Sequence, residues 1–204
     1  MKDKNHFFLH LVTEKGNHKL FDLLIKKGHD PHRIRYPNHS KESLVHSATI
    51  SGDISMMKKV ENIGLDVHAN SKWGNALYYA CTGAHMEMLR YLINEKGLDA
   101  KIILKHRTLL HNYISYRDPL IPGVPKPKVG DTGNSFSLVN DDLEFIRTLI
   151  KAGVDINAEN VSGKTALDVS LESYRIKDPL FNFKPRHALL KSLGAKKGSG
   201  IKKQ

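Results

Sequence analysis

The sequence predicts an all-α protein that is built from repeated pairs of short helices, and three observations lead to this class. Five segments of the 204-residue chain share one apolar pattern, and they start near residues 7, 43, 75, 108 and 165. Four of them are followed, directly or after an insertion, by a second segment whose apolar residues recur at helical spacing. Each of these four second segments ends at a Gly-x-Asp triplet. Periodicity on this scale is typical of arrays of repeated units.

The first helix of each predicted pair is short and dominated by small or apolar residues. Ala48, Ala80 and Cys81 are examples of the small residues that such a helix needs if it is to pack between its neighbours. The five segments are FFLHLVTEKGN from Phe7, SLVHSATISGD from Ser43, NALYYACTGAH from Asn75, TLLHNYI from Thr108 and TALDVSL from Thr165.

The second helix of each pair carries an apolar stripe, as Leu20, Leu23 and Leu24 illustrate. Gly28 and Gly153 stand where two of these helices must end, because glycine tolerates the left-handed conformation of a helix C-cap. One helix pair cannot bury both of its apolar sides, so we expect the pairs to stack on one another.

These five phased copies resemble the ankyrin repeat family, whose unit follows the pattern TPLHxAAxxGHxxVVxLLLxxGADVNAxxxxG. The resemblance covers about residues 5–195 of the chain. It implies an all-α ankyrin-repeat solenoid of about five repeats, each with two antiparallel helices followed by a β-hairpin finger. We therefore expect one domain over residues 1–195, and a flexible basic tail over residues 196–204.

Histidine occupies a fixed position in this pattern. His10, His46 and His111 fill the histidine of the TPLH motif, and Tyr78 and Asp168 replace it in the other two units. The resemblance implies that each histidine ring forms a hydrogen bond to the backbone of a neighbouring finger.

Two insertions interrupt the array, at residues 115–140 and 172–184. Because both leave consecutive units at the same edge, we expect them to be neighbours in space. One interpretation is that they cover the last units of the array, and the other is that they form a lobe that binds a partner. The stretch IPGVPKPK in the first insertion also matches a polyproline II ligand.

The resemblance implies that a partner binds to the concave surface, which finger tips and first helices form. The expected partner is another protein with an acidic face, bound by a monomer. We expect Trp73 and Tyr79 to be anchors, because large rigid side chains bury much area at a low entropic cost. The predicted binding residues are Lys72, Trp73, Tyr79, Lys105, Arg107, Asn112 and Lys164, together with Tyr116 and Phe136 from the first insertion.

Catalysis and bound cofactors are not expected. The stretch AENVSGKT, from Ala158 to Thr165, matches the loosest form of a phosphate-binding loop, but a helix pattern precedes it in place of a buried strand. His29, His32 and His39 lie near one finger, yet their spacing does not match a defined metal site. We therefore predict a chain that is not an enzyme and needs no metal or cofactor.

The formal net charge of +11 attracts acidic proteins, nucleic acids and anionic membranes without selecting among them. Electrostatic binding of nucleic acid or of an anionic membrane is therefore the alternative function. The single cysteine, Cys81, excludes an internal disulfide, and no apolar run approaches the length of a membrane span. We expect a cytoplasmic protein, and the family resemblance implies, as an alternative, an effector that a microbe delivers into a host cell.

Overall fold

The computed structural model describes residues 5–116, 135–174 and 184–200. Helices dominate these ranges, and the only strands within them are β1 and β2, of two residues each. The predicted all-α class is therefore confirmed. The chain divides into two compact units, residues 1–98 and 99–204, and each unit is described by itself below.

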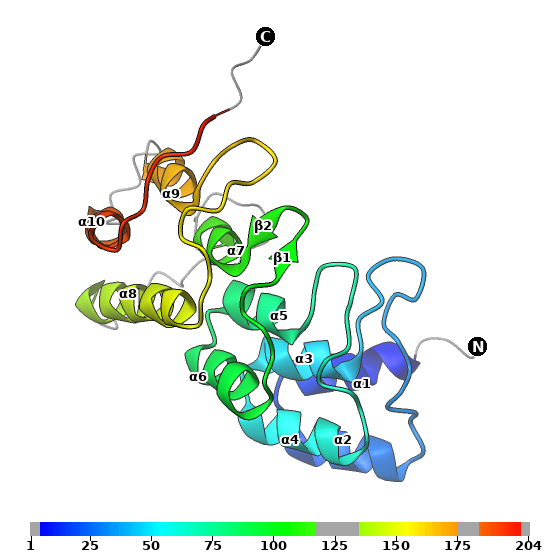
Figure 1. Ribbon diagram of the computed structural model, residues 1–204. Coiled ribbons are helices and arrows are strands. Elements are labelled where there is room, and N and C mark those ends of the chain that lie inside the picture. The colour runs from blue at the N-terminus through cyan, green and yellow to red at the C-terminus, as the bar shows by residue number, and fades with distance from the viewer. Residues whose placement is uncertain (1–4, 117–134, 175–183, 201–204) are drawn as a thin grey trace. The chain divides into compact units, whose positions relative to one another are not determined.

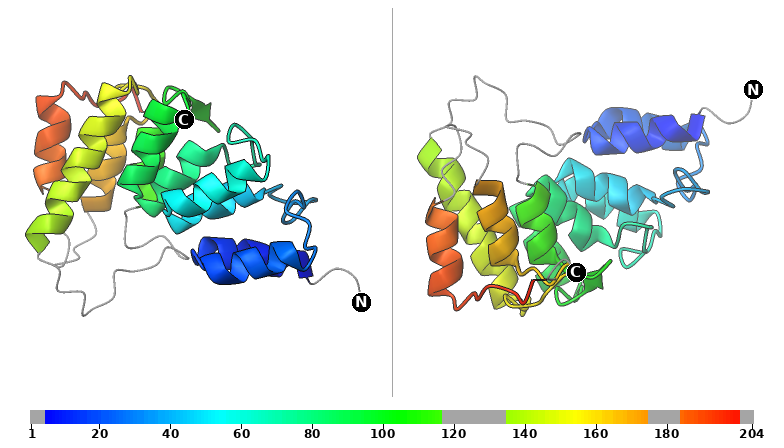
Figure 2. Two further views of the ribbon diagram at one scale, coloured as in Figure 1. Left: turned by 90° about the horizontal axis from the view of Figure 1, so that it is seen from below. Right: turned by 90° about the horizontal axis from the view of Figure 1, so that it is seen from above.

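Unit 1 consists of three successive helix pairs (Figures 1 and 2). Within it, α1 packs against α3, and α3 packs against α5. The third pair ends in a π-helical turn, η1. The elements are α1 (Asn5–Glu14), α2 (His18–Lys26), α3 (Leu44–Ser51), α4 (Ile54–Asn62), α5 (Ala76–Gly83), α6 (Met86–Arg90) and η1 (Tyr91–Glu95).

Polar side chains fix where the helices of unit 1 begin. Asn17 caps α2 by accepting a hydrogen bond from the Leu20 amide, at 3.1 Å. Asp53 caps α4 in the same way and accepts from the amides of Ser55 and Met56. Such caps pair amide groups that have no partner inside the helix, and each stabilises its helix by about 1 kcal/mol.

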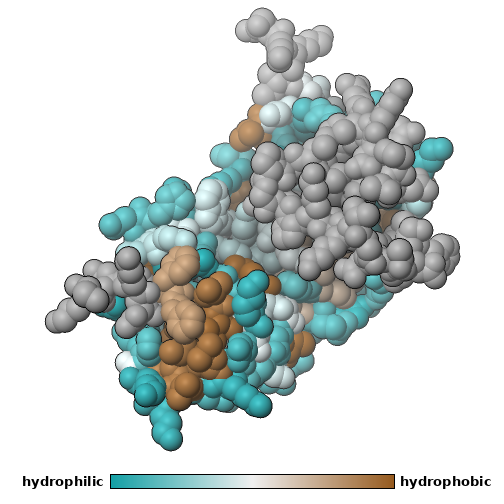
Figure 3. Space-filling model, turned by 180° about the vertical axis from the view of Figure 1, so that it is seen from behind, coloured by the Kyte–Doolittle hydropathy of each residue, from teal (hydrophilic) through white to brown (hydrophobic). Residues whose placement is uncertain are grey.

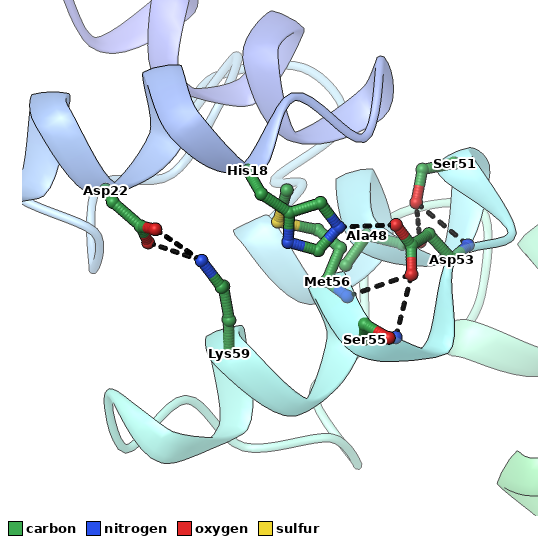
Figure 4. Close-up of polar contacts among 8 residues, drawn as sticks. All are labelled: His18, Asp22, Ala48, Ser51, Asp53, Ser55, Met56 and Lys59. Carbon is green, nitrogen blue, oxygen red and sulfur yellow. Dashed lines mark hydrogen bonds and ion pairs between the residues drawn. The ribbon is translucent and has the colours of Figure 1, made fainter.

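The helix pairs of unit 1 are also joined by polar contacts between their second helices (Figure 4). The His18 ring at the start of α2 lies 2.6 Å from the Asp53 carboxylate at the start of α4. One turn further along each helix, Lys59 binds Asp22 at 2.5 Å. The two contacts hold α2 and α4 side by side, in register.

The core of unit 1 is mainly apolar, with a few buried polar residues such as His10 and His46. Its fully buried side chains come from every helix pair, and they include Leu9, Leu44, Met56, Met57, Leu77, Met88, Leu89 and Leu92. Cys81 of α5 is completely buried among them, and desolvation raises the pKa of its thiol.

The described residues of unit 2 form a short antiparallel hairpin that is followed by four helices. Within it, α7 packs against α9, while α10 packs against both α8 and α9. The elements are β1 (Ile103–Leu104), β2 (Arg107–Thr108), α7 (Leu109–Tyr116), α8 (Ser135–Lys151), α9 (Ala166–Tyr174) and α10 (Lys184–Ser192).

A buried polar network holds three helices of unit 2 together. The Arg186 guanidinium of α10 makes a bidentate contact with the Asp142 carboxylate of α8, with both distances 2.8 Å. Tyr113 of α7 donates its hydroxyl to the same carboxylate at 2.9 Å. Its ring also stacks on Phe145, with 4.1 Å between the centroids. Bidentate charged hydrogen bonds are the strongest kind of side-chain pairing, so this network fixes α8 and α10 relative to α7.

Residues 196–200 belong to the tail that we expect to be flexible, and in the structure they make several hydrogen bonds to the loop between α8 and α9 and to the start of α9. The Gly198 amide donates to the Asp168 carboxylate at 2.7 Å, and the Gly200 amide donates to the Gly163 carbonyl at 3.0 Å. The Ser199 amide and hydroxyl both bind Glu159. The segment therefore lies along this loop as an added layer of backbone.

Candidate functional site

Two neighbouring loops of unit 1 form the candidate site, and they follow α2 and α4. The first loop folds back on itself, because Arg35 and Glu42 exchange backbone hydrogen bonds of 2.7 and 3.1 Å. The amide of Lys72 in the second loop donates to the carbonyl of Ser40 in the first, at 2.8 Å. The loops thus brace one another, and the side chains at their tips are held at fixed positions.

The first loop contains two residues in the left-handed backbone region that are not glycine. Tyr36 has φ 49° and Lys41 has φ 55°. This conformation costs a residue with a side chain about 1 kcal/mol or more. Backbone strain of this kind is often found at functional sites, where a side chain must be held in one position.

An aromatic and basic cluster lies at the base of the first loop. The ring of Phe7, from α1, makes an edge contact with the ring of Tyr36, with 5.5 Å between the centroids. The Arg35 guanidinium lies 4.5 Å from the Phe7 centroid and 5.1 Å from the Tyr36 centroid. Phe7 and Tyr36 are 37% and 45% exposed, so a partner can reach both rings.

The same guanidinium is paired with two carboxylates, Glu14 and Glu42. Desolvation raises the pKa of Glu14 above its usual value, although the adjacent Arg35 acts in the opposite direction. Arg35 is therefore fixed from below by acids and from the sides by aromatic rings. Phe7 and Arg35 are absent from the binding residues that the sequence predicts. The signal for Arg35 was the basic and aromatic stretch RIRYP beside a finger, and Phe7 had no such signal.

Trp73 lies on the second loop and is half-buried. Its backbone amide donates to the Ser71 hydroxyl at 3.1 Å. The Lys72 ammonium lies 5.8 Å from the centroid of the indole, and the His39 ring of the first loop lies 6.3 Å from it. The predicted binding residues Lys72 and Trp73 are therefore close together and at the surface.

Tyr79, the other anchor that the sequence predicts, is only 6% exposed. Its hydroxyl lies 2.9 Å from the Ser71 hydroxyl and donates to the Glu42 carboxylate at 3.2 Å. Its ring makes an edge contact with His46. Tyr79 therefore ties α5 to both loops from beneath, and Trp73 is the more accessible of the two aromatic residues.

The histidines of the repeated pattern connect first helices to loops. His10 lies 3.1 Å from the Arg33 carbonyl through Nε2, and 2.8 Å from the Ser47 hydroxyl through Nδ1. In unit 2, Nε2 of His111 lies 3.0 Å from the Lys164 carbonyl. The predicted contact between ring and loop backbone is confirmed for these two residues. Desolvation lowers the pKa of the third, His46, to about 4, so its ring is neutral at pH 7.

Unit 2 contains the other predicted binding residues. Lys105 is exposed at the tip of the β1–β2 hairpin, where its φ of 48° is again left-handed, and Arg107 is half-buried after the turn. Asn112 is buried, with 4% of its surface exposed. Lys164 binds Glu172 at 2.5 Å. The side chains of two further predicted residues, Tyr116 and Phe136, lie outside the described residues.

The loop that contains AENVSGKT is a closed turn. Its amides at Ser162 and Lys164 donate to the Asn160 side chain, and the Gly163 amide donates to the Asn160 carbonyl. A phosphate-binding loop needs several unpaired amides that converge on one point. The three amides named here already have acceptors within the turn.

Neither a metal cluster nor a membrane span is seen in the described part of the chain. No three His, Cys, Asp or Glu side chains in those ranges are grouped so that they could hold a metal ion. Within the same ranges, no helix combines the length and the apolar composition that are needed to cross a bilayer.

No family model matches this chain. A protein of Rickettsia bellii (strain RML369-C) that is named for ankyrin repeats is 30% identical over 148 residues, which are 72% of this chain and 18% of that protein. An L-asparaginase of Dirofilaria immitis is 26% identical over 139 residues, which are 62% of this chain and 23% of that protein. The chain therefore spans about a fifth of the length of each relative.

Proposed function

We propose that this chain is an ankyrin-repeat protein of about five units. The likeness to the Rickettsia bellii protein supports this assignment, as do the five first helices, which begin within two residues of the repeat starts that the sequence predicts. The repeated contact of His10 and His111 with the following loop adds support from both units. In this proposal the fifth unit is the C-terminal cap of the array. The two insertions project from consecutive units at the same edge of the array.

The proposed role is to bind another protein without catalysis. The observation that carries this proposal is the pair of loops in unit 1. A hydrogen bond joins the two loops, and Tyr36 on the first loop and Lys72 and Trp73 on the second are at least partly exposed. Aromatic side chains that are already ordered lose little entropy on binding, so they suit the centre of an interface. Lysine beside them steers and orients a partner with an acidic face.

Basic residues of unit 2 belong to the same proposal. Lys105, Arg107 and Lys164 lie on its hairpin and its second loop, and they would add contacts with acidic groups. Tyr79 and Asn112 would support the surface from within. We also propose that the protein is a cytoplasmic monomer, with delivery into a host cell as the alternative.

The test is capture from a nuclease-treated cell lysate by the immobilised full chain, with the bound proteins identified by mass spectrometry. A variant that combines Lys72→Glu with Trp73→Ala should lose at least about nine-tenths of the captured partner, which corresponds to about 1.4 kcal/mol. Val161→Ser is the matched control, because Val161 is an exposed residue of a loop in unit 2. A partner that both variants capture equally would place the interface elsewhere.

The net charge of +11 favours a second candidate, electrostatic binding of nucleic acid or of an anionic membrane. Binding of this kind falls steeply between about 50 and 200 mM salt, because it depends on the release of counterions. A protein complex that is anchored by Trp73 should survive this change. Capture that disappears over the same salt range, and that Trp73→Ala does not weaken, would favour the second candidate.

A further inference from the structure

The outer side of the first helix pair of unit 1 is apolar and exposed. Figure 3 shows a brown area gathered over α1 and α2. Phe8 and Leu11 of α1 and Leu23 of α2 are 44%, 38% and 48% exposed. Residues 8 and 11 are three positions apart, so their side chains lie on one side of α1. We call this surface, formed by Phe8, Leu11 and Leu23, the end face.

The same helices also bury apolar residues inside unit 1. Leu9 and Val12 of α1 are 2% and 4% exposed, and Phe21 and Leu24 of α2 are 2% and 8% exposed. These residues face the interior of unit 1, where α1 packs against α3. Helix α1 therefore buries one part of its apolar surface inside unit 1 and leaves the other part exposed on the end face. Exposed apolar surfaces that polar residues border often bind other proteins.

Lysines surround the end face. Lys15 extends the row of Phe8 and Leu11 by one turn of α1, and Lys19, Lys26 and Lys27 flank Leu23 on α2; all four are exposed. The acidic residues of these two helices are engaged elsewhere, because Asp22 binds Lys59 of α4 and Glu14 binds Arg35. The end face is therefore an apolar surface with a basic border.

We propose that the end face binds an amphipathic helix of another protein that has an apolar stripe and acidic residues on both sides of the stripe. The helix would lie against α1 and α2 as α3 lies against the inner side of α1, and it would pair its acids with the lysine border. A second copy of this chain is a poorer occupant, because two end faces in contact would bring two lysine borders together. This surface is distinct from the finger loops, so the inference does not depend on the proposed function.

The probe is a synthetic peptide of about 18 residues with leucine at positions i, i+3, i+4 and i+7 and glutamate at most others, long enough to form a helix on binding. Fluorescence anisotropy of the labelled peptide gives its Kd for the full chain. Phe8→Ser combined with Leu23→Ser should weaken binding at least about tenfold. Val161→Ser, which changes an exposed apolar residue of unit 2, should leave the Kd unchanged.

Two further arms test the charge of the partner and the separation of the two surfaces. A peptide with lysine in place of glutamate should bind at least about tenfold more weakly. Lys19→Glu combined with Lys27→Glu keeps the apolar residues and should reverse this preference. The Lys72→Glu/Trp73→Ala variant should bind the acidic peptide as the parent does, so failure of the proposed function would leave this result intact.

Several outcomes would overturn the proposal. One is equal binding of the acidic and basic peptides. Another is a Phe8→Ser/Leu23→Ser variant, called the serine variant below, that unfolds at the same temperature as the parent and binds the acidic peptide with the same Kd. Sedimentation that shows a dimer, dissociated by the serine variant, would make a second copy the occupant. Binding to phosphatidylserine vesicles that the serine variant abolishes, without any binding of the acidic peptide, would make a membrane the occupant.

Discussion

The two units of this protein are stabilised in different ways. In unit 1 the helices within a pair are joined by short turns, and its ion pairs, such as the one between His18 and Asp53, are partly exposed. In unit 2 a buried ion pair between Asp142 and Arg186 lies between helices that are distant in the sequence. Closely connected helices can be positioned by stacking and by local contacts, whereas helices that follow long insertions are positioned here by a buried ion pair.

The largest expected effect comes from breaking the network of unit 2. Asp142→Ala leaves the Arg186 guanidinium buried without its carboxylate, and this should cost unit 2 about 3–5 kcal/mol. Circular dichroism during urea unfolding measures the loss of helix. The fluorescence of Trp73, the single tryptophan of the chain, reports on unit 1 and should change much less.

A double variant sharpens this test. Asp142→Leu with Arg186→Leu removes both charges and keeps apolar volume, so it should recover most of the stability that Asp142→Ala loses. If Asp142→Ala shifts the tryptophan and dichroism transitions equally, the contrast between the units would not hold.

The second expected effect is a pH dependence of unit 1. Burial lowers the pKa of His46 to about 4, below its usual value of 6.5, so protonation favours the unfolded chain. The contribution of neutral His46 to the free energy of unfolding is fully present above pH 6.5. This contribution decreases as the pH falls to 4, by about 3 kcal/mol at most. Urea unfolding followed by Trp73 fluorescence at pH 7.5 and pH 4.5 measures the loss.

His46→Asn should remove most of this pH dependence, because asparagine does not titrate. Its side-chain oxygen can still accept the hydrogen bond from the Ser43 amide. Burial also lowers the pKa of His85 in the same unit, which leaves a smaller residual slope. His32→Asn, on an exposed loop, is the control and should keep the slope of the parent. A His46→Asn variant with the full parental slope would contradict this assignment.

A smaller effect is expected at the contact between α2 and α4. Asp53→Ala removes the cap of α4 and the partner of His18 together, so it should destabilise unit 1 by about 1–2 kcal/mol. Lys59→Ala breaks only an exposed ion pair and should cost less than about 1 kcal/mol. Thermal unfolding of both variants measures the difference, and equal losses would show that the cap contributes little.

The smallest effect concerns the loops that both units present. Lys41→Gly in unit 1 and His106→Gly in unit 2 place glycine at φ values of 55° and 60°. Relief of the left-handed backbone should outweigh the added entropy of the unfolded chain and stabilise each unit by about 0.5–1 kcal/mol. Thermal unfolding checks both variants. A loss of stability at only one position would show that its side chain makes contacts worth more than the strain.

The sequence predicted the helix pairs well, because their signals are local. Apolar spacing located α2 and α4, and the glycines at their ends, such as Gly28 and Gly64, have the left-handed φ that a C-cap requires. The structure places Lys72 and Trp73 on the loop between α4 and α5, where the repeat pattern predicts a finger. These features depend on residues that are close together in the chain.

Other features depend on contacts over long distances in the sequence. Asp142 and Arg186 are 44 positions apart, and both lie next to insertions for which the repeat pattern gives no register. Tyr79 is a residue type that is common at binding surfaces. Only the folded chain shows that this side chain is buried, with its hydroxyl bonded to Ser71 and Glu42. Phe7 begins the first repeat segment, and only the folded chain shows that its ring contacts Tyr36 at the surface.

The burial of Cys81 makes its thiol an intrinsic probe of local opening. A thiol reacts as its thiolate, and this one is shielded from solvent while its ionisation is suppressed. Alkylating reagents will therefore modify it only in molecules whose third helix pair has opened. The rate of that labelling, followed by mass spectrometry, measures how often this part of unit 1 opens under native conditions, without denaturant and without any change to the sequence.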